Sequence, residues 1–143
     1  MASVSLSATA TLRNSQSQTP IAGVGGAACA IGEVVYKSIT TGLWSPAIAT
    51  ALATLGTSAG SGRLGLCVAG CGAANQDILI LMGGSVTTSG LTAGVPYFVA
   101  TDVAGDIAPV ADVDTANGYL ALVGFAKSAT ELILMPYVLG VTI

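Results

Sequence analysis

The stretch Gln76–Val110, QDILILMGGSVTTSGLTAGVPYFVATDVAGDIAPV, decides the fold because four short strand patterns follow one another in it. Each pattern is rich in branched or aromatic residues, and glycines separate the patterns, which is typical of short strands joined by tight turns. The first pattern is continuously apolar after its first residue, so we expect that strand to be buried on both faces. The four expected strands are Asp77–Met82, Ser85–Thr88, Pro96–Thr101 and Asp106–Pro109.

Similar patterns lie on both sides of this stretch. Further strands are expected at Gly32–Lys37, Arg63–Ala69, Tyr119–Ala126 and Glu131–Val138, and Lys127–Thr130 is expected to form a four-residue hairpin turn. About ten short strands with glycine, proline and asparagine turns indicate a sandwich or barrel and not alternating strands and helices. The predicted fold is therefore mainly β, a compact antiparallel β-sandwich or barrel.

One short helix is expected, at Pro46–Leu55. Ser45 is a suitable N-cap, proline suits the first helical position, alanine is the best helix former, and Gly56 suits the position after the helix.

The first 20 residues are expected to form an extended arm and linker, followed by a β-rich domain over residues 21–143. Ser3–Leu12 alternates between polar and apolar residues, which predicts a strand. This strand either docks on another subunit, or it is an ordinary first strand of the chain's own sheet or a frayed terminus. The lone tryptophan is expected to anchor a core or a subunit interface, with sugar stacking as the alternative. The candidate partner-binding residues are Val4, Leu6, Leu12, Arg13 and Trp44.

Composition indicates that much apolar surface is hidden by partners. Charged residues make up only 8% of the chain, and the mean hydropathy is +0.80, whereas about a quarter of the residues in an average domain are charged. The net charge of −3 disfavours nucleic acid and anionic membrane surfaces as partners. The apolar run Leu43–Leu55 is too short to span a membrane, and without a secretory signal the chain is expected in a reducing cytoplasm.

The residue types needed for catalysis or metal binding are scarce. The chain has no histidine, so the commonest general base is missing, and no Lys, Asp or Glu is placed to activate a nucleophile. Three cysteines, Cys29, Cys67 and Cys71, are expected to be free thiols and do not form a zinc site. Asp112 and Asp114 lack the further oxygen ligands of a calcium loop. We therefore expect no enzyme activity, no metal and no cofactor.

Taken in order, the glycine turns and apolar runs resemble the small β-rich decoration, or cement, proteins of tailed-bacteriophage heads. The resemblance covers about residues 21–140 and rests on Gly32–Tyr36, Pro46–Leu55, Leu64–Ala69, Ile78–Gly84, Ala93–Val99, Gly105–Pro109 and Leu122–Ala126. It implies a virion structural protein, assembled in the host cytoplasm, that binds the outside of the capsid, often as a trimer. The implied partners are further copies of the chain and the major capsid protein.

Two other functions stay open at this point. Modules similar to this one also occur in phage tail fibres and tailspikes, so the alternative is a trimeric tail-fibre or tailspike module that binds the host surface. An enzyme subunit would need a cleft with perturbed carboxylates among Asp102, Asp106, Asp112 and Asp114.

Overall fold

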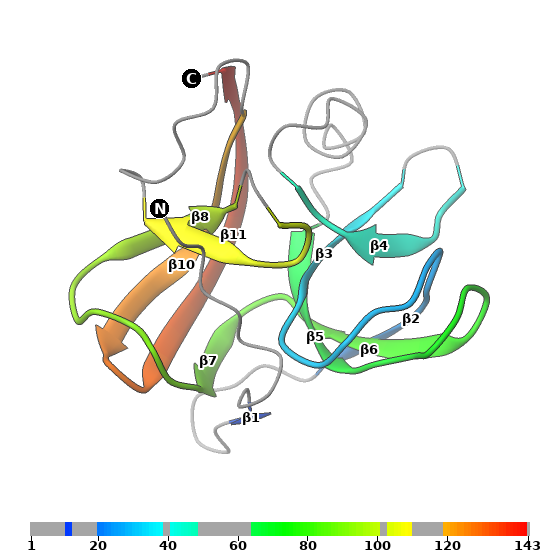
Figure 1. Cartoon of the computed structure of the whole chain (residues 1–143), viewed down its shortest axis with the longest axis horizontal. Helices are drawn as coiled ribbons and strands as arrows, with labels where there is room; N and C mark the ends of the chain where they lie inside the picture. Colours follow the sequence, from blue (N-terminus) through cyan, green and yellow to red (C-terminus); the bar gives the residue numbers. More distant parts are fainter. Residues whose placement is uncertain are drawn as a thin grey trace.

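The computed structural model describes residues 11–12, 20–38, 41–48, 64–100, 103–109 and 119–142. Within these ranges the chain forms eleven strands and no helix, and the strands make two antiparallel sheets in a sandwich-like arrangement (Figure 1). The mainly β fold predicted from the sequence is confirmed.

A six-stranded sheet and a five-stranded sheet divide the strands between them. The first has the order β1–β7–β11–β10–β8–β9 and comprises β1 (Thr11–Leu12), β7 (Gly84–Thr87), β8 (Pro96–Val99), β9 (Ile107–Pro109), β10 (Tyr119–Ser128) and β11 (Glu131–Thr142). The second has the order β2–β6–β5–β3–β4 and comprises β2 (Ile21–Val24), β3 (Val34–Lys37), β4 (Trp44–Pro46), β5 (Leu64–Ala69) and β6 (Asp77–Leu81).

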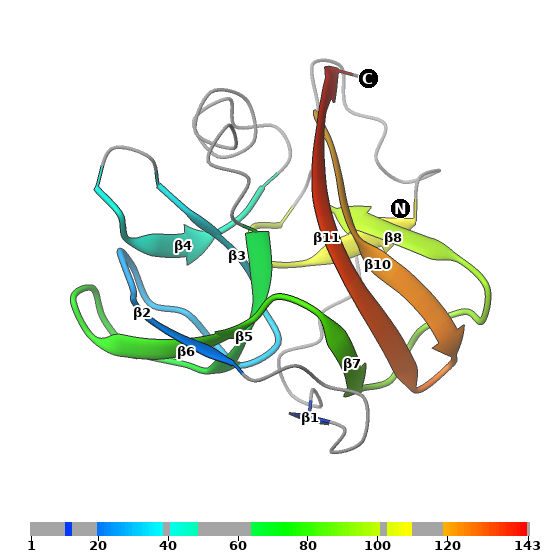
Figure 2. The same cartoon turned by 180° about the vertical axis from the view of Figure 1, so that it is seen from behind.

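All four strands expected in Gln76–Val110 are present, as β6, β7, β8 and β9. The stretch also joins the two sheets, because β6 belongs to the five-stranded sheet and β7 to the six-stranded one (Figure 2). The crossing is made at Met82 and Gly83, and Gly84 has a φ of 85°, a conformation that favours glycine. The glycine pair that marks the end of the first strand in the sequence is thus the point where the chain changes sheets.

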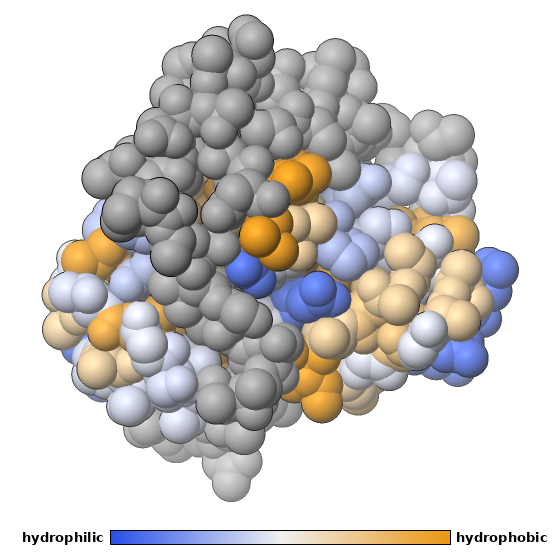
Figure 3. Space-filling model, viewed as in Figure 1, coloured by the Kyte–Doolittle hydropathy of each residue, from blue (hydrophilic) through white to orange (hydrophobic). Residues whose placement is uncertain are grey.

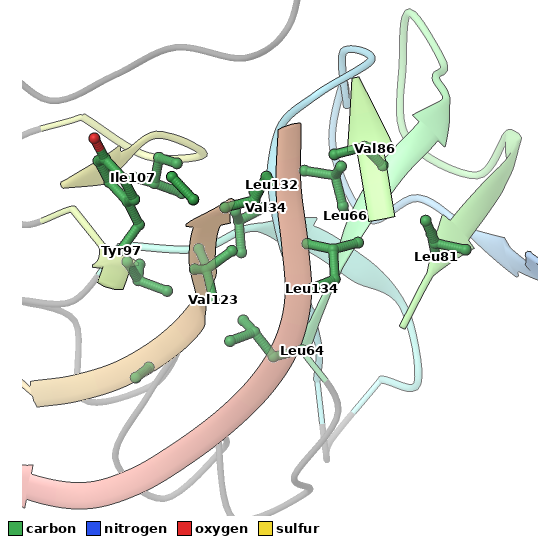
Figure 4. Packing of buried hydrophobic residues seen from close by; sticks show 14 of the residues in the cluster. Val34, Leu64, Leu66, Leu81, Val86, Tyr97, Ile107, Val123, Leu132 and Leu134 are labelled. Carbon is green, nitrogen blue, oxygen red and sulfur yellow. The ribbon is translucent and has the colours of Figure 1, made fainter. Parts of the chain in front are cut away.

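The main core fills the space between the two sheets. Side chains from both inner faces meet there, such as Leu66 of β5 and Leu132 of β11, and both are fully buried (Figure 4). Burying one such side chain stabilises the fold by roughly 1.5–3 kcal/mol. The cluster consists of Val34, Ala47, Leu64, Leu66, Leu81, Val86, Leu91, Tyr97, Val99, Ile107, Ala121, Val123, Ala126, Leu132 and Leu134.

The five-stranded sheet curls around a second core of its own (Figures 1 and 2). Its two outer strands meet where Gly25, directly after β2, forms a bridge to Trp44 of β4, and the Gly26 amide donates to the Trp44 carbonyl at 2.6 Å. A Cβ on Gly23 would lie 2.6 Å from the Trp44 indole nitrogen, so only glycine allows β2 to pass this close to the ring. The buried residues of this cluster are Cys29, Val35, Trp44, Cys67, Ile78 and Ile80.

The expectation that the first strand of Gln76–Val110 is buried on both faces is wrong for β6. Ile78 and Ile80 of β6 point into the second core and Leu81 contributes to the main core, but Leu79 is 41% exposed. The main core covers the outer side of β6 only at Leu81. The continuous apolar run therefore reflects two different environments along one strand.

Two other expectations also need correction. Pro46 is the last residue of β4 and not the first of a helix, because β4 pairs with β3 and the Ala47 amide then donates to the Val34 carbonyl at 2.9 Å. Residues 49–55 of the expected helix lie outside the described ranges. The hairpin between β10 and β11 is tighter than predicted: Ser128 pairs with Glu131, which leaves two residues in the turn.

The outermost strands of the six-stranded sheet are short, and β11 has partner strands on both sides only from Glu131 to Leu134. At one edge, β1 has two residues, and Leu12 pairs with Val86 of the same chain. At the other edge, β9 has three residues and ends at Pro109, which cannot donate a backbone hydrogen bond.

Candidate interaction surface

The described part of the chain offers no enclosed site for chemistry. No pocket is found in it, and no three Cys, Asp or Glu side chains in the described ranges lie close enough together to hold a metal ion. No helix among the described residues is long and apolar enough to cross a membrane. The described surface, in contrast, carries several large apolar side chains that are exposed.

The outward face of β11 carries the most exposed apolar side chains. Leu132 and Leu134 point into the main core, so the residues between and after them point away from it. Met135 is 51% exposed and Tyr137 is 63% exposed. Both residues lie beyond Leu134, where β11 pairs with β10 and no longer with β7.

Neighbouring strands extend this apolar surface across the sheet. Phe125 of β10, which is 40% exposed, lies opposite Ile133 of β11. Directly opposed residues of antiparallel strands have their side chains on the same face. Leu122 of β10 lies opposite Tyr137 on one side and Phe98 of β8 on the other, which makes a row across three strands. We call Phe98, Leu122, Phe125, Ile133, Met135 and Tyr137 the outer apolar face.

A β-bulge interrupts the hairpin beside the outer apolar face. Between the pairs Gly124–Leu134 and Leu122–Tyr137, β11 has one residue more than β10. On β11, Met135 and Tyr137 lie two residues apart and share a face by ordinary alternation. The bulge shows instead in β10, where Leu122 and Phe125 lie three residues apart and both face outward. Gly124 is needed at the bulge, because a Cβ there would collide with the Ile133 carbonyl oxygen.

The outer apolar face contains no charged residue. The nearest charges on the hairpin are Lys127 and Glu131, which lie at its turn. Elsewhere, on the side of the molecule drawn in Figure 3, strongly hydrophilic residues form only a few small, separate areas. An uncharged sheet face of six large apolar side chains has the composition of an interface core.

The candidate partner-binding residues fall in three different places. Trp44 is only 2% exposed and packs in the second core, so the core alternative accounts for it. The backbone of Leu12 pairs with Val86 of its own chain, as in the alternative of an ordinary first strand. Val4, Leu6 and Arg13 lie outside the described ranges.

Sequence reasoning missed the residues that the structure exposes most. Glu131–Val138 is an apolar run with no alternation, and such a run predicts burial on both faces. The one available signal was Pro136, because proline within a strand marks an edge or a bulge.

A scan against models of protein families and a search of curated proteins find no match to this chain.

Proposed function

We propose that this chain is a structural protein of a bacteriophage virion that binds the outside of the assembled capsid as a homotrimer and stabilises the shell. The outer apolar face is the observation that carries the proposal. Contiguous apolar surface of this kind on a folded domain marks a site of protein association. The low charge and the absence of histidine support association in place of catalysis.

Copies of the same chain are the partners that fit this face best. The face is uncharged, and homo-oligomer interfaces are more apolar than the interfaces of transient complexes. A closed ring of copies buries the same face on every subunit, and closed symmetry is the rule among soluble homo-oligomers. The threefold symmetry, the capsid and its exterior come from the resemblance to decoration proteins.

The stabilising role follows from binding linkage. A protein that binds the assembled shell and not its separated subunits shifts the equilibrium towards the assembled shell. Weak contacts at many equivalent positions add up through multivalency, so each trimer needs only modest affinity.

The molecular mass of the chain in solution tests whether it forms a homotrimer. Light scattering of the purified chain at micromolar concentration should give about three times the chain mass of 13.9 kDa. Met135→Lys places a charge in the outer apolar face and should reduce the mass to that of a monomer. Ile31→Lys is the matched control, because Ile31 is also an exposed apolar residue but lies in the turn before β3. A wild-type monomer, or equal effects of the two substitutions, would contradict the proposed interface.

Experiments on whole particles test whether the chain binds and stabilises the capsid. Cryo-EM of particles that carry the chain should show its density on the shell, and shells without it should release their contents at a lower temperature. Equal release temperatures would leave a protein that decorates the shell without stabilising it.

The tail-fibre alternative has one observation in its favour. Tyr137 and Phe125 are exposed aromatic residues, and aromatic rings stack on sugars. Sugar sites combine such rings with polar groups, however, and the outer apolar face has no charged residue to supply them. Density on the tail and not on the shell would decide for this alternative.

A further inference from the structure

Cys29 and Cys71 lie directly opposite each other although 41 residues separate them in the chain. They form an isolated antiparallel bridge, in which the Cys29 amide donates to the Cys71 carbonyl at 3.0 Å and the Cys71 amide donates to the Cys29 carbonyl at 2.9 Å. Such a hydrogen-bonded pair holds its Cα atoms about 5.5 Å apart. Disulfides need a Cα separation of roughly 4.4–6.8 Å, so the backbone is already in range.

The two thiols also point to the same place. Cys29 Sγ donates to the Ala27 carbonyl oxygen at 3.5 Å, and Cys71 Sγ donates to the same oxygen at 3.4 Å. Residue 25 is glycine beside them, and a Cβ there would lie 2.8 Å from Cys71 Sγ. Both sulfur atoms therefore lie within hydrogen-bond distance of the Ala27 carbonyl oxygen, and the missing side chain of Gly25 leaves space for Cys71 Sγ.

The third cysteine has no such partner. Cys67 lies opposite Ile80 of β6, and its thiol donates to the Ala69 carbonyl oxygen at 3.4 Å. All three cysteines are free in the structure, Cys29 and Cys67 being buried and Cys71 half-buried.

We propose that Cys29 and Cys71 are a redox pair that forms a reversible disulfide and locks the segment between β2 and β3 onto the end of β5. This inference rests on the two cysteines and is independent of the proposed function. The oxidant is a small-molecule disulfide such as oxidised glutathione. The bond closes a loop over residues 30–70, which restricts the unfolded chain and should stabilise the fold.

The chemistry proceeds by two thiol–disulfide exchanges. The Cys71 thiolate attacks oxidised glutathione first, because Cys71 is the cysteine that solvent reaches, and one glutathione leaves. Cys29 then loses its proton to solvent and attacks the Cys71 sulfur, and the second glutathione leaves. Two protein thiols are oxidised and one glutathione disulfide is reduced to two glutathione molecules.

Burial slows the second exchange and makes it depend on pH. Burial is the larger cause and the neighbouring Cys71 the next, and together with smaller contributions they raise the pKa of the Cys29 thiol to about 12. The thiolate is the attacking form, so closure should accelerate as pH rises.

The experiment uses the full chain, purified with reductant and then incubated with oxidised glutathione at mildly alkaline pH. Thiol titration of the unfolded product should fall from three per chain to one. The intact mass should be lower by two hydrogen atoms, with Cys29 and Cys71 joined in one crosslinked peptide. The Tm should rise by about 5–10 °C, and added reductant should reverse the rise.

Single substitutions identify the pair. Cys67→Ala should still form the bond, and its thiol count should fall from two to none. Cys71→Ser should keep both remaining thiols and show no rise in Tm. A wild-type chain that retains glutathione on Cys71, that links Cys67, or whose Tm does not rise would overturn the proposal.

Discussion

The two sheets of this protein differ in how they bury the apolar side chains on their two faces. The five-stranded sheet curls until its outer strands meet at Gly25 and Trp44, and it thereby surrounds the second core while its other side joins the main core. The six-stranded sheet contributes one face to the main core and leaves Phe125, Met135 and Tyr137 exposed on the other. Under the proposed function, the curled sheet mainly supplies stability and the six-stranded sheet supplies the surface for association.

The largest effect on folding is expected from Trp44→Ala. The indole is the largest fully buried side chain, and its removal leaves a cavity inside the curled sheet. The free energy of unfolding should fall by about 3–5 kcal/mol in urea denaturation. Ile31→Ala removes an exposed side chain and should stay within about 0.5 kcal/mol of wild type. Equal losses in the free energy of unfolding for the two variants would mean that the second core does not contribute to stability.

A smaller loss in the free energy of unfolding is expected when a side chain is added inside the curled sheet than when one is removed. In Gly23→Ala the new methyl group meets the Trp44 ring at 2.6 Å and Ile80 at 2.8 Å, so β2 must move away. Overpacking of this kind costs about 1–3 kcal/mol in the free energy of unfolding. Gly72→Ala is the control, because a Cβ on Gly72 meets no atom within 4 Å. If both variants unfold at the same urea concentration, the close approach of β2 to the Trp44 ring does not contribute to stability.

Alkaline pH should weaken the curled sheet. Burial raises the pKa of Cys29 to about 12 and that of Cys67 to about 11, from an ordinary value of 9.0. Between these values the unfolded chain has lost protons that the folded chain keeps, so the free energy of unfolding falls as pH rises. The contribution is complete below about pH 9 and is lost as pH approaches 11–12.

Cysteine substitutions test this pH dependence. The double variant Cys29→Ala and Cys67→Ala should lose stability with pH less steeply than wild type. Cys71→Ser removes only a smaller cause of the raised pKa values and leaves both thiols buried, so its slope should lie between those of the double variant and wild type. Parallel curves for all three chains would show that the buried thiols titrate normally.

The smallest effect on folding is expected at the outer apolar face. Tyr137→Ser replaces a side chain that is 63% exposed, so at a protein concentration low enough for monomers the Tm should change by no more than a few degrees. A loss as large as that of Trp44→Ala would place Tyr137 in the core of its own chain and would remove the contrast between the two sheets.

The strands of the six-stranded sheet could be predicted where a local pattern defines them. Pro96–Val99 is a short aromatic and branched run between glycine turns, and it forms β8 as expected. The run before Pro136 also forms a strand as expected, but a continuous apolar run does not show which of its side chains face the main core and which face solvent. Local composition therefore predicts that a strand exists better than it predicts which side is buried.

The curled sheet was less predictable because distant contacts define it. Ile21–Val24 forms β2, but Gly23 gives it no alternating pattern, since the position is filled by the ring of Trp44 from another strand. The opposition of Cys29 and Cys71 also leaves no trace in local sequence. The proline and alanine pattern at Pro46 favoured a helix, yet pairing of β4 with β3 overrode that propensity at its start.

The short edge strands have a consequence for a chain this apolar. Exposed strand edges are templates for the cross-β stacking that leads to fibrils, and hydrophobic chains are the most vulnerable. In the described ranges, the outermost strands of the six-stranded sheet are the two residues of β1 and the three of β9, which stops at Pro109. β11 is paired on both sides only from Glu131 to Leu134, and beyond Leu134 it pairs with β10 alone. The edges of the other sheet meet each other at Gly25 and Trp44. The short outermost strands and the closed edges of the curled sheet are poor templates for growth of a sheet from molecule to molecule. Among the described strands, such growth is therefore expected to start at β11 beyond Leu134, beside the exposed Met135 and Tyr137.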